Sequence, residues 1–384
     1  MTLTIKIQNV GPYQEAEIPI HPLTILTGPE NSDYFYLLRF LHTIYRLHEM
    51  YISYIPDLRR SPKVKRDPTP AVIDLIGKTA LEEIYNQNLM NLLESYFGVK
   101  TSDLRLQKSI LGHVYLTSEQ ARTHLVTDDA ESLICFESEC PLPAGLFAKG
   151  PKDLPRPGQS TTAFTPVIRG VIGNWVAFIS EGCPPHSLYL PNNRVEIINA
   201  YDREIDPAKN SPLIIELINE LDGFFVSKER YNPDPWREEE MTLINGESRL
   251  IVHPDGSYEI VVRKGDTDLP PDALPPECTS LIPIFLSLKY RRVTGDVFII
   301  EEPELHLNQE QQIHLARLFT KMVKAGYRII IGTRSSVIID EIKRIISGNQ
   351  SSSDLGDPIC ADDVTLCIEE KMVWGRGLHP VDLR

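Results

Sequence analysis

The chain has 384 residues, 42% of them hydrophobic, so it can bury one large core or two modest ones. Asp and Glu number 53 against 39 Lys and Arg, which gives a formal net charge of −14. This balance excludes a global basic field that would attract nucleic acid or an anionic membrane surface.

The cysteine pattern and the start of the chain indicate a compartment. Six cysteines are scattered without a Cys-x-x-Cys spacing, which argues against a zinc site or a disulfide framework. The first residues contain no apolar signal segment, and no apolar run approaches membrane-spanning length. We therefore expect a cytoplasmic, reducing location and no membrane partner.

Three strands are predicted in the first 27 residues. Leu3–Ile7 is followed by a Gly-Pro turn, then by Glu15–Ile20, and then by Leu23–Thr27, which runs into a glycine. The apolar residues that follow recur at helical intervals and predict a helix with Ser32 or Asp33 as its N-cap.

The loop between the third strand and this helix begins with a glycine, as a phosphate-binding P-loop does. A P-loop of the form GxxxxGK[ST] wraps backbone N–H groups around phosphates, while its Lys reaches the β/γ oxygens and its Ser/Thr contacts Mg²⁺. Here the loop begins with Gly28, Pro29, Glu30, Asn31 and Ser32. Asp33 then replaces the second glycine, Tyr34 the lysine, and Phe35 the hydroxyl. A cation is lost and an anion is gained where phosphate would approach.

Residues 51–186 are expected to form an insertion. A capping box at Thr79–Glu82 opens a predicted helix, and alternating patterns at His113–Leu116 and Leu133–Phe136 predict antiparallel strands. Pro141–Pro166 is predicted to be a long loop. Neither a heptad run nor an internal repeat is visible, which argues against a long coiled coil.

A basic segment lies near the start of this insertion. Its cations are Arg59, Arg60, Lys63, Lys65 and Arg66. The segment is either a solvated linker or a contact for nucleic acid or an acidic partner, and the sequence leaves both readings open.

Two further elements are predicted before the next motif. Pro212–Ile218 is apolar and predicted to be helical, with Ser211 as its cap and proline at the first helical position. Arg249–Val252 and Tyr258–Val262 are predicted to pair as a hairpin around an Asp-Gly turn.

An apolar run that ends in two adjacent carboxylates is the most informative motif of the chain. Val297–Ile300 predicts a buried strand, and Glu301 and Glu302 follow it directly. This is the pattern of a Walker B element, in which the first carboxylate can hold Mg²⁺ through water and the second can orient an attacking water. The alternative is a core strand that runs into a solvated acidic turn.

The C-terminal part continues with regular elements. We predict a helix at Gln309–Ala325, a strand at Arg328–Ile331, a helix at Val337–Ile346 and a strand at Val364–Glu369. Arg334 follows the first of these strands and is either a solvated charge or an anion contact.

Two segments carry a resemblance to a known family. The acidic pair continues through Pro303–Leu307 to read EEPELHL, which resembles the EEPExHL of the SMC/RecF/OLD branch of ABC-type ATPases. Ser187–Arg194 is similar to that family's YLPAER segment, with Arg194 at the position of its arginine and Asn193 at that of its acidic residue. The opening strands and the loop also fit the family.

The resemblance implies an α/β fold: a P-loop NTPase-like, ABC-type ATPase head with a mixed sheet, interrupted by a mostly helical and antiparallel insertion. Residues 1–50 and 187–384 would form the head, and residues 51–186 the insertion. ATP and Mg²⁺ would be the cofactors. The loop residues from Gly28 to Ser32 would cradle the phosphates, Glu301 would hold the metal, and Glu302 and Arg334 would be catalytic.

The chain departs from the family at two more motifs. Where the family has a Ser-Ser-Gly signature that contacts the γ-phosphate held by the opposite protomer, this chain reads Pro275, Pro276 and Glu277. Proline has no N–H to donate, and a carboxylate repels phosphate. The switch histidine of the family is replaced by Arg334, which cannot shuttle a proton near neutral pH.

These departures favour a degenerate ATPase-fold subunit with weak or no hydrolysis. It would assemble with itself, with an intact ATPase homologue or with an effector protein, and family analogy suggests prokaryotic DNA maintenance or anti-phage defence. Two alternatives stay open: an ATPase that hydrolyses Mg-ATP through Glu302, and a nucleic-acid-binding module that uses the basic segment.

Overall fold

The structure is a computed structural model. It describes residues 3–10, 12–54, 113–117, 122–126, 135–138, 187–199, 201, 212–226, 235–253, 258–290, 296–348, 359–372, 375–381 and 383. The predicted helix after Thr79, the proline-rich loop, the cap at Ser211 and the basic segment from Arg59 to Arg66 lie outside the described residues.

The chain divides into two compact units, and each is described by itself. Unit 1 comprises Met1–Ile20, Arg39–His186 and Ile368–Pro380. Unit 2 comprises His21–Leu38, Ser187–Cys367 and Val381–Arg384. The division into residues 1–50, 51–186 and 187–384 stays a prediction.

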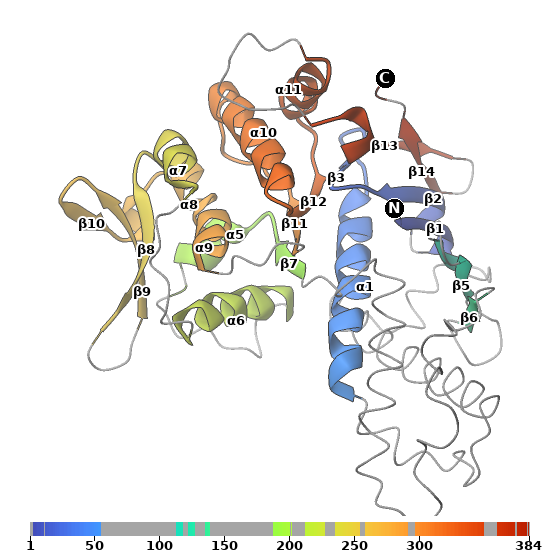
Figure 1. Ribbon diagram of the computed structural model, residues 1–384, viewed down its shortest axis with the longest axis horizontal. Coiled ribbons are helices and arrows are strands. Elements are labelled where there is room, and N and C mark those ends of the chain that lie inside the picture. The colour runs from blue at the N-terminus through green and yellow to red at the C-terminus, as the bar shows by residue number, and fades with distance from the viewer. Residues whose placement is uncertain are drawn as a thin grey trace, which may run out of the picture. The chain divides into compact units, whose positions relative to one another are not determined.

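Unit 1 is built on a mixed sheet (Figure 1). Its strands are β1 (Leu3–Val10), β2 (Tyr13–Ile20), β4 (His113–Thr117), β5 (Arg122–Val126), β6 (Cys135–Ser138), β14 (Arg376–Val381) and the second half of β13 (Val364–Lys371). The order is β6-β5-β4-β1-β2-β14. β1 pairs antiparallel with β2 and β4, whereas β14 runs parallel to β2. The predicted α/β class with a mixed sheet is confirmed.

Unit 2 contains a parallel sheet in the order β3-β12-β11-β7. The strands are β3 (Leu23–Thr27), β12 (Arg328–Gly332), β11 (Val297–Glu301) and β7 (Ser187–Leu190). Their side chains are almost all buried, which explains why they read as continuous apolar runs rather than alternating ones. This order, with an apolar strand feeding a loop and helix, is consistent with the predicted P-loop NTPase-like head.

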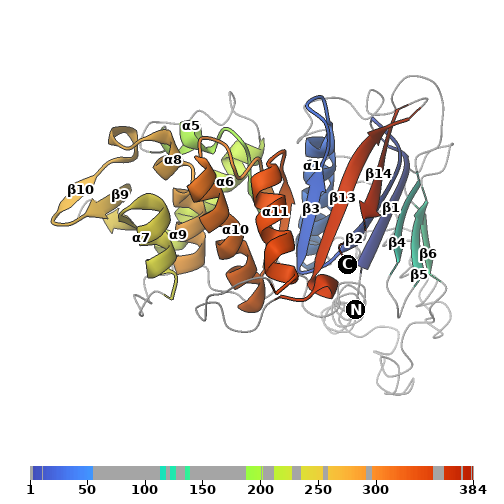
Figure 2. The same cartoon turned by 90° about the horizontal axis from the view of Figure 1, so that it is seen from above.

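Unit 2 contains helices that the sequence predicted and others that it did not. They are α1 (Tyr34–Tyr54, of which the first five residues belong to this unit), α5 (Arg194–Asn199), α6 (Pro212–Val226), α7 (Arg237–Ile244), α8 (Pro276–Thr279), α9 (Ile282–Tyr290), α10 (Gln309–Lys324) and α11 (Ser336–Ile346). Helices such as α6, α10 and α11 were predicted, whereas α5 and α7 were not. α10 and α11 lie side by side (Figure 2). Of the helices that the structure describes, none has the length and apolar character needed to cross a bilayer.

Local chemistry sets where α10 and α11 begin. Asn308 and Gln311 form a reciprocal capping box, with both side chain to backbone distances at 3.0 Å. The Ser335 hydroxyl accepts from the Ile338 N–H at 3.1 Å and caps α11. The Ser335 cap starts α11 directly after the short loop that follows β12.

A second, antiparallel sheet in unit 2 has the order β10-β9-β8. It consists of β8 (Glu247–Val252), β9 (Tyr258–Lys264) and β10 (Thr267–Leu269). β8 and β9 pair from Glu247 with Arg263 through Val252 with Tyr258, so the predicted hairpin is confirmed. Its turn lies outside the described residues. Short 3₁₀ turns occur at Pro271–Ala273 and Ala361–Asp363.

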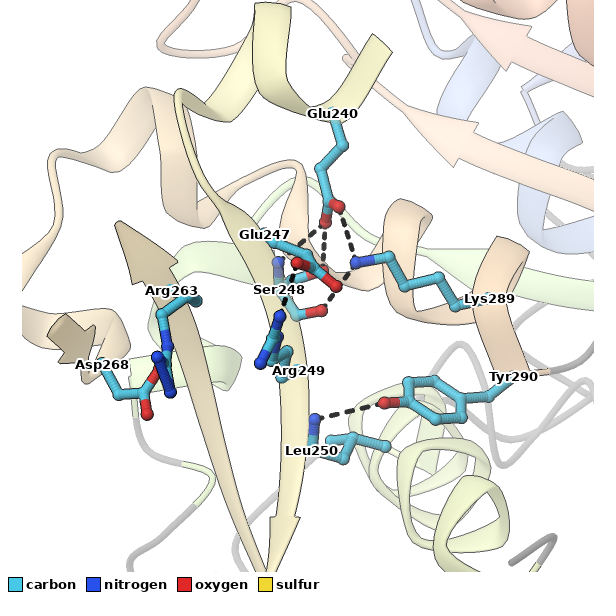
Figure 3. Close-up of polar contacts among 9 residues, drawn as sticks. All are labelled: Glu240, Glu247, Ser248, Arg249, Leu250, Arg263, Asp268, Lys289 and Tyr290. Atoms are coloured by element: carbon cyan, nitrogen blue, oxygen red, sulfur yellow. Dashed lines mark hydrogen bonds and ion pairs between the residues drawn. The ribbon is translucent and has the colours of Figure 1, made fainter. Parts of the chain in front are cut away.

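A buried ion pair joins this second sheet to the helices (Figure 3). Glu240 of α7 is fully buried and lies 2.6 Å from the ammonium of Lys289 on α9. Ser248 of β8 donates its N–H at 2.9 Å and its hydroxyl to Glu240, while its carbonyl accepts from Lys289 at 2.7 Å. Burial raises the pKa of Glu240, and Lys289 offsets part of that rise. One carboxylate thus holds two helices and a strand.

The substitution Lys289→Met leaves Glu240 buried without its cation. We expect the free energy of unfolding to fall by about 3–5 kcal/mol near neutral pH. The folded-state pKa of Glu240 then rises further above its unfolded value, so folding takes up a proton. The deficit should therefore shrink as the pH falls through that pKa. Urea denaturation at neutral and mildly acidic pH measures it.

The double variant Glu240→Gln/Lys289→Met is the matched control, because it removes the titrating carboxylate together with the cation. At neutral pH its deficit should be smaller than that of the single variant, and its own stability should lack the pH dependence that Glu240 contributes in the other two proteins. A single-variant deficit that grows on acidification contradicts this account of the pair.

Candidate functional site

The strands β3, β12 and β11 are parallel neighbours, so the loops that follow them lie together at the carboxyl end of the sheet. This end of the sheet, with its three loops, is called the edge below. The loops are residues 28–33 after β3, residues 302–308 after β11 and residues 333–335 after β12. Ligands of open α/β sheets bind outside the carboxyl ends of the strands. This edge contains the site residues predicted from the sequence.

Arg194 is the central buried group of this edge. Its side chain is fully buried and donates to five backbone carbonyls. The acceptors are Ser280 (from Nε, 2.9 Å), Pro191 (3.2 Å) and Glu301 (2.9 Å) from Nη1, and Glu302 (3.1 Å) and Pro303 (3.3 Å) from Nη2. Burial lowers the pKa of Arg194 to about 10, so it keeps its charge at neutral pH. It ties α5, the segment before α9 and the turn after β11 together.

Glu301, the predicted metal ligand, is fully buried and hydrogen-bonded within the protein. The Tyr189 hydroxyl donates to Oε1, and the Asn192 N–H donates to Oε2 at 3.1 Å. Both oxygens therefore already accept protein donors. The sequence analysis missed Tyr189 and Asn192, although they lie in the segment next to Arg194.

Glu302, the predicted general base, has a strained backbone. Its φ of 40° is in the left-handed region that side-chain-bearing residues avoid. The conformation is held because its N–H donates to the Gly332 carbonyl at 2.9 Å and its carbonyl accepts from Arg194. The carboxylate accepts from Asn192 Nδ2 at 3.3 Å and lies 3.8 Å from Arg334 Nη1. The structure thus brings Glu302 and Arg334 together.

Glu304 is a third carboxylate, which the sequence analysis did not assign to the site. It accepts from the Thr333 hydroxyl and from the Arg334 N–H, both at 2.8 Å. Burial raises the pKa of Glu304. Ser335 donates its N–H to Thr333 at 3.0 Å, so this carboxylate organises the loop that precedes α11.

Tyr34, which the sequence analysis aligned with the lysine of a P-loop, is fully buried. A Cβ added to Gly332 would lie 2.6 Å from the Tyr34 ring and from Leu38, so the end of β12 and the start of α1 are in tight contact. The Tyr34 hydroxyl lies within reach of the Arg334 side chain. Burial raises its pKa, the charge of Glu304 adds to the rise, and the charge of Arg334 opposes it.

The loop after β3 closes on itself. Ser32 donates its N–H to the Pro29 carbonyl at 2.9 Å, and Tyr36 donates to the Asp33 carbonyl at 2.8 Å at the start of α1. Glu30 and Asn31 are exposed, and Ser32 is buried. One of the amides that a P-loop would offer to phosphate is therefore used inside the loop.

The segment from Pro275 to Ser280, which the sequence analysis compared with a signature motif, is also hydrogen-bonded internally. The Ser280 hydroxyl donates to the Glu277 carbonyl at 3.1 Å, and the Thr279 hydroxyl donates to Pro271 at 3.2 Å. The Cys278 N–H donates to the Pro275 carbonyl at 3.0 Å. These donors are therefore used in hydrogen bonds to carbonyls of the same segment or of the turn just before it.

The residues of this edge do not fit a magnesium-bound triphosphate. Tyr34 offers a phenol that stays neutral where a triphosphate needs a cation. Glu301 and Glu304 accept two protein donors each. The carboxylates of Glu301 and Glu304 are therefore occupied by hydrogen bonds within the protein.

No protein-family model and no curated protein matches the chain. Among solved structures, the SMC head bound to the C-terminal winged-helix domain of ScpA aligns at 11% identity and a TM-score of 0.45, over 99% of this chain and 97% of that one. The SMC head domain from Thermotoga maritima aligns at 13% identity and 0.43, over 99% of both chains.

A third solved structure, an SMC head domain with an extended coiled coil bound to the C-terminal domain of ScpA, derived from Pyrococcus furiosus, aligns at 11% identity and a TM-score of 0.44. The alignment covers 99% of this chain and 96% of that one. At such identities and TM-scores, these likenesses assign no activity, ligand or partner to this chain.

The substitution Arg194→Lys tests the role of the buried guanidinium. Lysine has three N–H donors, so at least two of the five carbonyls would lose their partner. Each unsatisfied buried acceptor costs about 1–3 kcal/mol, so we expect a loss of at least about 2 kcal/mol in the free energy of unfolding. Guanidinium chloride denaturation measures the loss.

Arg237→Lys, at an exposed arginine on α7, makes the same chemical change without the buried acceptors and should be nearly neutral. Equal stability of the two variants contradicts the assignment of Arg194 as the residue that organises this edge.

Proposed function

We propose that this chain is an ATPase-like head that does not hydrolyse ATP and acts as a protein-binding subunit of a larger assembly. The observation that carries the proposal is the burial of Tyr34 at the start of α1, against Gly332, in the position of a P-loop lysine. Phosphoryl transfer depends almost wholly on positioning and on charge stabilisation. Without that lysine, both are weakened.

The charges of the edge support the same conclusion. A triphosphate placed beside α1 would approach Asp33, Glu302 and Glu304. Each carboxylate at a distance of about 5 Å from a phosphate oxygen would cost on the order of 3 kcal/mol at an effective dielectric near 20. Arg334 offers a compensating charge, but its side chain is 39% exposed, so solvent screens it.

Without nucleotide chemistry, the role left for Glu301, Glu302 and Arg194 is structural, because they fix the shape of the edge. A surface of fixed shape can bind another protein. We propose a second copy, an intact ATPase homologue or an effector protein as the partner, in a cytoplasmic setting. Prokaryotic DNA maintenance or anti-phage defence is the context suggested by the EEPELHL resemblance.

Nucleotide binding and turnover test this proposal. The purified chain with Mg-ATP should show no nucleotide-dependent rise in melting temperature and no phosphate release above that of the Glu302→Gln variant. The physical reason is that ligand-induced stabilisation requires selective binding to the folded state. Differential scanning fluorimetry and a coupled phosphate assay measure the two quantities.

Glu238→Gln, at an exposed position on α7, removes the same charge outside the three loops of the edge and is the matched control. ATP turnover that persists in Glu238→Gln and disappears in Glu302→Gln would favour the alternative, a working ATPase with Glu302 as its base, over the proposed function.

A further inference from the structure

Arg334 lies between an aromatic ring and a carboxylate. Its guanidinium carbon is 5.5 Å from the centroid of the Phe35 ring, and Nη1 is 3.8 Å from Glu302 Oε1. A planar cation that stacks on an aromatic face and points its N–H groups at a carboxylate is the usual way in which proteins recognise guanidinium. The residues around Arg334 therefore make a guanidinium site within the chain.

The contacts that hold the Arg334 side chain are weak. A distance of 3.8 Å is longer than a charge-assisted hydrogen bond, and 39% of the side chain is exposed. By contrast, the backbone is fixed, because the Arg334 N–H donates to Glu304 at 2.8 Å. The side chain can leave the site by rotation about its own bonds while the loop stays in place.

The groups behind Arg334 are suited to a donor-rich cation. The Tyr34 hydroxyl is fully buried, is held neutral by burial and lies within reach of the Arg334 side chain. It lies close enough to Glu302, Glu304 and Arg334 to interact with their charges. A neutral hydroxyl and a carboxylate can both accept from an arginine, which has five N–H donors.

We propose that this edge is a binding site for an arginine side chain of a protein partner, which displaces Arg334 from its position over Phe35. The inference deepens the proposed function, because it names the chemistry by which the edge would contact its partner. It rests on the proposed function only in that the ligand belongs to a protein partner. Arg334 serves as the internal occupant that keeps the carboxylate paired until the partner arrives.

Removal of the internal occupant should open the site to a free arginine. The probe is L-arginine methyl ester, observed by saturation-transfer difference NMR with wild type and with Arg334→Ala. We expect the guanidinium-side methylene signals to be about fivefold stronger with Arg334→Ala, because a tethered competitor has been removed. L-Citrulline methyl ester, which has nearly the same shape without the charge, should give no signal.

Two variants make the result specific. Arg334→Ala/Glu302→Gln should lose the gain, because the carboxylate that binds the probe is gone, while Arg237→Ala on α7 should behave as wild type. If Arg334→Ala is poorly folded, Arg334→Gln replaces it in the same comparison. Equal arginine signals in all variants, or equal signals for arginine and citrulline, would overturn the inference.

The outcome is separable from the test of the proposed function. Arginine binding that depends on Glu302 supports the site whether or not ATP also binds. Failure of the arginine probe leaves the ATP measurements unaffected and removes only the partner chemistry proposed for this edge.

Discussion

The buried guanidinium of Arg194 is the interaction on which the functional edge depends. Five carbonyls from three separate segments point at one side chain, and each would be an unsatisfied buried acceptor without it. Two of these carbonyls belong to the acidic pair, Glu301 and Glu302. The strained backbone at Glu302 is stable only because such bonds over-determine it.

The bonds to Arg194 also determine which partners the carboxylates have. With the turn after β11 fixed, Glu301 is directed to Tyr189 and Asn192, and Glu304 to the loop after β12. Glu302 retains the weakest contacts and the greatest freedom to meet a ligand. An edge of this kind is preorganised, but its donors and acceptors are largely matched to one another rather than to phosphate.

The elements that could be predicted from the sequence are those whose signal is local. β3 begins and ends at the predicted residues, and α10 and α11 start at side-chain caps that are visible in the sequence. α7 was not predicted, because its run of three glutamates hides the apolar residues that it buries. β14 was not predicted because it contains Gly377 and Pro380, which usually interrupt strands.

The site was predictable only in part. The adjacent carboxylates and the altered P-loop residues can be read from spacing, and so can the placement of Arg334 after an apolar strand. The partners of Glu301 and Glu304 cannot be read in this way, because Tyr189 and Thr333 are 112 and 29 residues away along the chain. No local pattern marks the Tyr34 ring as the group that packs on Gly332. Such pairings are fixed by the sheet order, which the sequence alone does not determine.

The central claim is that the polar groups of this edge are hydrogen-bonded to one another and that the edge does not bind a triphosphate. The most direct test is a crystal structure of the protein crystallised with Mg²⁺ and a non-hydrolysable ATP analogue. The account predicts that the Tyr34 ring remains against Gly332, that Arg194 keeps its five carbonyls, and that no nucleotide is bound at the start of α1. A magnesium-bridged triphosphate seated in the loop after β3, with Glu301 turned toward the metal, would contradict it.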